Sequence, residues 1–181
     1  MSSTGRDPFL EGLAGMKDAG RDPKAFGAAM RLMRDALFGG RRDKTKAIAE
    51  HFGVSPRQAR RLMAGDVKTV KADRAEKIRD EFSSDQRLRR VAVDAGGKPA
   101  RPGKQMRLTV TGNGGPIIGD SDHSKRPRPP IDLTLTPSQY ERLRTAFADH
   151  GATGALDEIN QHGDQYFDSF QWSKVSHIEV R

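Results

Sequence analysis

The chain has 181 residues and no cysteine, which suits one or two small domains without a disulfide framework. Hydrophobic residues make up 34% of it, and no apolar run approaches the roughly 20 residues that a membrane span requires. The net charge of +8 is uneven: residues 21–107 carry 23 Lys and Arg against 11 Asp and Glu, and residues 131–181 carry 4 against 8. We therefore expect a cytoplasmic protein whose basic front half binds a polyanion and whose acidic back half contacts another protein.

The first expected ordered element is a helix that begins at Pro23. Residues 1–22 are rich in Gly, Ser and Asp and lack the features of a signal peptide, so they are predicted to form a disordered lead-in. Pro23 suits the first position of a helix. Apolar residues then recur at helical spacing as far as the Gly39-Gly40 pair, and they are Phe26, Met30, Met33 and Leu37.

Residues 45–63 (TKAIAEHFGVSPRQARRLM) have the pattern of a helix-turn-helix. Ala49 is the small residue that a close helix crossing needs, and Gly53 permits the positive φ of a sharp turn. Ser55 caps the second helix and Pro56 takes its first position. The apolar residues that would anchor both helices are Ile48, Phe52, Val54, Ala59 and Leu62.

The second helix of this pair is the predicted recognition helix, because such helices reach base edges in the major groove. Arginine pairs best with guanine and glutamine with adenine, and the residues expected at bases are Arg57, Gln58 and Arg61. Those expected at phosphates are Lys44, Lys46, Arg60 and Lys68, and Thr45 and Ser55 complete the predicted DNA-binding set. The alternative is an amphipathic helical hairpin whose arginines only face water.

After the helix-turn-helix, another helix is predicted over residues 67–82, followed by a basic stretch at residues 87–90. Residues 95–105 (AGGKPARPGKQ) are rich in Gly, Pro and Lys and are predicted to be a flexible linker.

The back half alternates apolar and polar residues over 106–111 and 131–135, which predicts two strands around an exposed loop at 112–130. Thr136 and Gln139 form a capping box for a helix that stops near Gly151. A second helix from Thr153 and a terminal strand complete a β-β-α-α-β unit. The expected fold class is therefore mainly α with a small α+β C-terminal unit, divided into a lead-in (1–22), a helix-turn-helix DNA-binding domain (23–94), a linker (95–105) and an α+β domain (106–181).

The order of these parts resembles the terminal proteins of linear actinomycete replicons, the Streptomyces-type telomere proteins. The segments that carry the resemblance are MRLMRDAL, TKAIAEHFGVSPRQARRLMAG, ADRAEKIRDEF, TPSQYERLRTAF, QYFDSF and HIEV. They run from about Ala25 to the end of the chain. The helix-turn-helix by itself is shared with many regulators, so the order of the parts and the chain length carry the comparison.

The resemblance implies a protein that caps telomeres and primes end-patching DNA synthesis. Such a protein binds the single-stranded 3′ overhang together with a telomere-associated protein and a DNA polymerase, and presents a side-chain hydroxyl to the first deoxynucleotide. It would accept a nucleotide rather than catalyse the transfer, with no cofactor of its own and the Mg²⁺ held by the polymerase. Its location would be cytoplasmic and nucleoid-associated, with the α+β domain serving protein interaction and priming.

The resemblance places the priming hydroxyl just ahead of IDLTLTPSQY. Counting back without gaps from Tyr140 reaches Ser124, where this chain has serine and the family has threonine. A single gap in the count would select Ser121, and Thr134 remains open, whereas Thr136 ranks lower because it is expected to cap a helix. The nearby cations that would attract a triphosphate are Lys125, Arg126 and Arg128. The alternative is an ordinary loop serine.

Two other groups of residues have side chains suited to metal binding or to stacking. The loop residues Asp120, Asp122 and His123 have metal-ligand chemistry, but no partner segment accompanies them and no metal site is predicted. The aromatic residues near the end are expected to pack in a core, with a protein-docking surface as the alternative; they are Tyr166, Phe167, Phe170 and Trp172.

The alternative function is a transcription or replication regulator that binds duplex DNA as a homodimer, with the C-terminal half as its dimerisation unit. A third hypothesis is an adaptor whose basic half coats DNA while its acidic half recruits a partner. A preference for a single-stranded telomeric end indicates the telomere-capping function, whereas a preference for an inverted-repeat duplex indicates the regulator.

Overall fold

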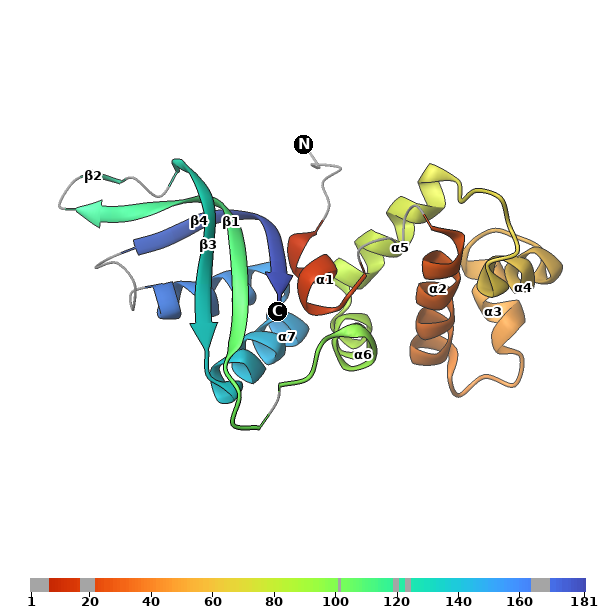
Figure 1. Ribbon diagram of the computed structural model, residues 1–181. Helices are drawn as coiled ribbons and strands as arrows, with labels where there is room; N and C mark the ends of the chain where they lie inside the picture. Colours follow the sequence, from red (N-terminus) through yellow and green to blue (C-terminus); the bar gives the residue numbers. More distant parts are fainter. Residues whose placement is uncertain (1–6, 17–21, 101, 119–120, 123–124, 164–169) are drawn as a thin grey trace.

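The computed structural model describes residues 7–16, 22–100, 102–118, 121–122, 125–163 and 170–181 (Figure 1). The front part is helical and comprises α1 (Pro8–Leu13), α2 (Pro23–Phe38), α3 (Lys44–His51), α4 (Pro56–Ala64), α5 (Ala72–Ser84) and α6 (Gln86–Gly96). The back part comprises β1 (Met106–Ile118), β2 (Ser121–Asp122), β3 (Pro127–Leu135), α7 (Pro137–Gly163) and β4 (Phe170–Val180). The prediction of a mainly helical chain with a small sheet in its C-terminal half is confirmed.

The sheet is antiparallel, with β1 between β3 and β4. Leu108 of β1 is paired with Leu133 on one side and Val180 on the other, and all three side chains are buried. Because side chains alternate along a strand, this register gives the sheet one apolar face. That face packs against α7, which contacts β3 and β4 (Figure 1).

The expectation of an exposed loop over residues 112–130 is wrong for most of that range. β1 runs on to Ile118 and β3 begins at Pro127, so the two strands form a long hairpin. Gly112 lies inside the strand because β4 passes very close: a Cβ on Gly112 would lie 2.0 Å from the carbonyl oxygen of Lys174. The glycines that indicated a loop instead permit a close strand approach.

Helix α7 begins and bends as its sequence predicts. The backbone N–H of Thr136 donates to Gln139 Oε1 at 2.7 Å, and the N–H of Gln139 donates to Thr136 Oγ1 at 3.3 Å, which is the expected capping box. Gly151 has φ 69° and breaks the helix into two parts at the predicted position.

Helix α1 corrects the prediction that residues 1–22 are a disordered lead-in. Asp7 caps it by accepting hydrogen bonds from the N–H groups of Phe9 and Leu10, and Phe9, Leu10 and Leu13 are buried. The ring of Phe9 stacks on Phe147 of α7 at 6.1 Å between centroids. A six-residue helix is too short to show a clear sequence period, and its stability comes from these tertiary contacts. Residues 1–6 and 17–21 lie outside the described part.

The predicted linker is partly helical and is bound to the back half. Helix α6 extends to Gly96, and its neighbour in space is α7 (Figure 1). Lys98 Nζ donates to the carbonyl of Val180 at 2.6 Å, while Tyr140 Oη donates to the carbonyl of Lys98 at 3.1 Å. The buried apolar residues of both halves form one continuous core, so the two predicted domains are packed together.

Within the described residues, no helix has both the length and the apolar character needed to cross a lipid bilayer.

Candidate nucleic-acid interface

Helices α3 and α4 pack against each other across a tight turn. Gly53 has φ 60°, and the N–H of Val54 donates to the carbonyl of Ala49 at 2.9 Å, which closes the turn. Ala49, Ile48 and Ala59 are buried where the helices meet. The small residue and the glycine therefore lie where the sequence pattern requires them.

The ends of α4 are defined by local hydrogen bonds. Ser55 Oγ accepts from the N–H of Gln58 at 3.2 Å at the N-terminus. At the C-terminus Gly65 has φ 78°, and the N–H of Asp66 donates to the carbonyl of Arg61 at 2.9 Å. Both ends of α4 are thus fixed by residues that the sequence identifies.

Helix α2 supports α4 from behind, through two residues that sequence reasoning missed. Gly27 allows a close approach, because a Cβ there would lie 2.6 Å from the carbonyl oxygen of Leu62. Arg31 donates a hydrogen bond to the carbonyl of Met63, near the end of α4. A glycine inside an otherwise helical pattern is the signal for such a close contact.

Helix α5 holds the end of α3. His51 Nε2 lies 2.7 Å from a carboxylate oxygen of Glu81. Lys77 donates to the carbonyl of His51, and its ammonium lies 5.2 Å from the centroid of the Phe52 ring. The α3–α4 pair is therefore supported by both α2 and α5.

The face of α4 that points away from this support is basic. Arg57, Gln58, Arg60 and Arg61 are exposed, and the three arginines form no ion pair with any described carboxylate. A surface hollow of about 220 Å³ lies beside them, lined by Ser55, Arg57, Gln58, Arg61 and Val67. The predicted base-contacting residues are thus brought together on one exposed helix face.

The predicted phosphate contacts differ in their surroundings. Lys68 is exposed and without an ion-pair partner among the described residues, whereas Lys46 lies 4.0 Å from Glu50. Lys44 and Thr45 are half-buried, and Lys44 Nζ lies 4.0 Å from Asp35. The pKa of Asp35 is lowered, first by the hydrogen bond from Arg34. Its carboxylate therefore stays charged and offsets Lys44.

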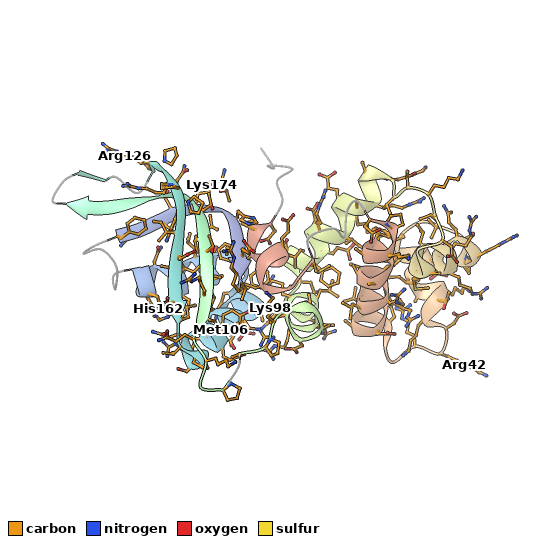
Figure 2. The ribbon with its side chains drawn as sticks, in the orientation of Figure 1. Arg42, Lys98, Met106, Arg126, His162 and Lys174 are labelled. Atoms are coloured by element: carbon orange, nitrogen blue, oxygen red, sulfur yellow. The ribbon has the colours of Figure 1, made fainter. Side chains whose placement is uncertain are left out.

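The connector between α2 and α3 adds a cation that sequence reasoning left out. Arg42 is exposed and lies at the end of the molecule farthest from the sheet (Figure 2). The adjacent Arg41 is held in place over the ring of Phe38, with 5.4 Å between its guanidinium carbon and the ring centroid. The connector is too short for any periodic signal, but it lies directly before α3 in the chain.

The predicted priming hydroxyls are described only in part. Ser124 lies outside the described residues, and Ser121 lies in β2, where its backbone alone is described. Thr134 is half-buried in β3, opposite Arg107 of β1. Thr136 is engaged in the capping box.

Among the described residues that carry a hydroxyl, Tyr140 is the most deeply buried. Its side chain is buried in the core, and this burial raises its pKa to about 12. A buried phenol that keeps its proton is a poor nucleophile.

The loop residues with metal-ligand chemistry and the aromatic residues near the C-terminus are described in part. Asp120 and His123 lie outside the described residues, and Asp122 is placed in β2. Among the described residues no group of three or more His, Cys, Asp or Glu could hold a metal ion. Phe170 and Trp172 are buried with ring centroids 5.3 Å apart, as a packed core requires, while Tyr166 and Phe167 lie outside the described part.

No protein family model matches this chain, and neither the curated proteins nor the solved structures include one similar to it at a significant level.

Proposed function

We propose that this protein binds DNA by inserting α4 into the major groove. The observation that carries the proposal is the exposed face of α4, where Arg57, Arg60 and Arg61 have no carboxylate partner in the described part of the chain. The supports behind α4 fix its position, so the helix itself does not need to be organised when DNA binds.

In this proposal the residues of α4 divide into two roles. Arg57, Gln58 and Arg61 read base edges, since arginine matches guanine and glutamine matches adenine in the major groove. The phosphate contacts come from the surrounding cations, which are Arg42, Lys44, Lys46, Arg60 and Lys68. Lys44 and Lys46 contribute less than the others, because each lies 4.0 Å from a carboxylate oxygen.

The experiment that tests DNA binding compares substitutions on α4 with one elsewhere. Arg57→Ala and Arg61→Ala should each weaken specific duplex binding by about tenfold to a hundredfold, because a bidentate base contact contributes roughly 1–3 kcal/mol. Arg90→Ala is the control: Arg90 is an exposed arginine of α6 that pairs with Asp149 at 2.5 Å. A selected duplex and fluorescence anisotropy would measure the affinities, and equal affinity for all four proteins would contradict the proposal.

We further propose, from the resemblance to actinomycete terminal proteins, that the bound DNA is a replicon end and that the protein primes synthesis there. It would act with a telomere-associated protein and a DNA polymerase, which supplies the Mg²⁺ ions, and would accept the nucleotide rather than transfer it. The hairpin that contains Ser121 and joins β1 to β3 supports this role, since it extends beyond α7 (Figure 1). A location at the nucleoid follows from the same proposal.

A deoxynucleotidylation assay tests the priming role. The protein would be incubated with a labelled deoxynucleotide, a telomeric 3′ overhang, Mg²⁺ and host extract, and then run on a denaturing gel. Label that is lost in Ser124→Ala identifies Ser124 as the acceptor. Label that is lost instead in Ser121→Ala or Thr134→Ala would assign that residue.

The second candidate function is a regulator that binds an inverted repeat as a dimer. It is favoured by the same feature of α4, because a helix presented in this way suits duplex rather than single-stranded DNA. Strong binding to a palindromic duplex, with no label transferred to the protein on any template, would select this function.

A further inference from the structure

A second basic surface lies in the sheet, at the end of the hairpin. We name it the basic ribbon; it consists of Lys125, Arg126, Arg128 and Lys174. Pro127 and Lys174 both pair with Asn113 of β1, one from each side, so the cation-bearing ends of β3 and β4 flank the central strand. Arg126 and Lys174 lie at the same end of the sheet (Figure 2).

Among the described residues, the basic ribbon differs from the other Lys and Arg residues of this half because it lacks ion pairs. Arg107, Arg142, Arg144 and Arg181 each form an ion pair with an Asp or Glu. Within the described residues, no member of the basic ribbon has a carboxylate partner, and Lys125, Arg126 and Lys174 are exposed. Among the described residues of 106–181, the Lys and Arg side chains without a carboxylate partner are therefore the four of the basic ribbon.

The edge strand beside this patch is unsuited to pairing with another chain. Among the described residues β3 pairs only with β1, and its first residues include Pro127, Pro129 and Pro130. Proline has no N–H to donate, so a peptide cannot add as a further strand along this part of the edge. Arg128 is also held along the strand, since its Nε donates to the carbonyl of Gly114 at 2.7 Å. A polyanion that is recognised by charge fits these features better than a peptide strand.

The basic ribbon and α4 lie at opposite ends of the molecule (Figures 1 and 2). Between them α6 and α7 are joined by reciprocal hydrogen bonds. Arg89 of α6 donates to the carbonyl of Phe147 at 3.1 Å, and Arg144 of α7 donates to the carbonyl of Val93 at 2.8 Å. The two basic surfaces are therefore held apart by one packed body.

We propose that the basic ribbon is a second DNA-binding surface that contacts the phosphate backbone, so that one molecule holds two DNA segments. The inference rests on the proposed function, because α4 is taken to hold the first segment. Binding at the ribbon is independent of base sequence, since it arises from charge alone.

A bridging assay tests this inference on the full chain. Wild-type protein bound to an immobilised duplex that contains its site should capture a second, labelled duplex of unrelated sequence. The variant Lys125→Gln/Arg126→Gln/Lys174→Gln should still bind the immobilised duplex but capture at least about tenfold less label, because three cations that supply affinity through phosphate contacts are lost. Arg128 is left unchanged in this variant, because its hydrogen bond to Gly114 supports the hairpin.

The control variant is Arg107→Gln/Arg181→Gln, which removes positive charges of the same half that are paired with Asp132 and Glu179. It should bridge as wild type does, and circular dichroism should show that both variants are folded. Bridging by the ribbon variant at the wild-type level, or no bridging by wild type, would overturn the inference. An acidic protein would then be the partner of the basic ribbon. Failure of the proposed function has a different signature, namely that Arg57→Ala/Arg61→Ala still binds the immobilised duplex as tightly as wild type.

Discussion

Arg89 shows how a single residue can differ from what its sequence neighbourhood indicates. It belongs to the basic stretch at residues 87–90 and counts toward the charge surplus of the front half, yet it is only 6% exposed. Its guanidinium donates to the carbonyls of Ser83, Phe147, Ala148 and Asp149. These carbonyls belong to the C-terminal ends of α5 and of the first part of α7, where the helix dipole is negative. The buried charge is thus stabilised by helix ends and is not available to DNA.

Replacing Arg89 by methionine should destabilise the protein by about 3 kcal/mol, because several charge-assisted hydrogen bonds are lost and buried carbonyls are left without donors. Arg90→Met is the control, since Arg90 is exposed and its pair with Asp149 should contribute about 1 kcal/mol or less. Urea unfolding measures both. A loss below about 1 kcal/mol for Arg89→Met would mean that water replaces the missing donors.

At the scale of elements, close backbone contacts explain where the glycines lie. Gly27 brings α2 against α4, and Gly112 brings β1 against β4. The first contact positions the proposed recognition helix, and the second forms the base of the basic ribbon. In both places a methyl group would collide with a carbonyl oxygen of the neighbouring backbone.

Gly112→Ala should therefore destabilise the sheet by about 3 kcal/mol or more, because the new Cβ would have to push β4 away from β1. Gly40→Ala is the matched control, since no atom lies within 4 Å of a Cβ at that position. Thermal unfolding followed by circular dichroism compares the two. Similar midpoints for Gly112→Ala and Gly40→Ala would show that β4 adjusts without cost.

On the scale of the whole molecule, α1 and α6 join the helical half to the sheet. Leu13 of α1 is fully buried, and a Cβ on Gly12 would lie 2.8 Å from Ile178 of β4, so α1 packs directly on the sheet. Because the core is continuous, we expect the two halves to unfold together.

The single tryptophan makes this expectation measurable. Trp172 lies in β4, so its fluorescence reports the sheet, whereas circular dichroism at 222 nm is dominated by the helices. The two signals should follow one transition. Leu13→Ala should lower the free energy of unfolding reported by both signals by about 3 kcal/mol, since it creates a cavity in the shared core. Two separate transitions, or a shift of only one signal, would show that the halves fold independently.

The sequence by itself determined the features that depend on neighbours along the chain. The Gly53 turn, the Ser55 cap and the Thr136–Gln139 capping box each involve residues within a few positions, so their chemistry can be read directly. The exposed basic face of α4 follows from helical periodicity for the same reason.

Only the tertiary structure decided the features that join distant parts of the chain. Helix α1 is ordered because Phe147 and β4 cover it, and Gly112 lies in a strand because β4 needs the space of its missing side chain. Arg89 is buried because two helix ends meet around it. Composition counts a charge or a glycine in the same way wherever it lies, whereas packing determines whether that charge faces water and whether that glycine bends the chain or lets two strands meet.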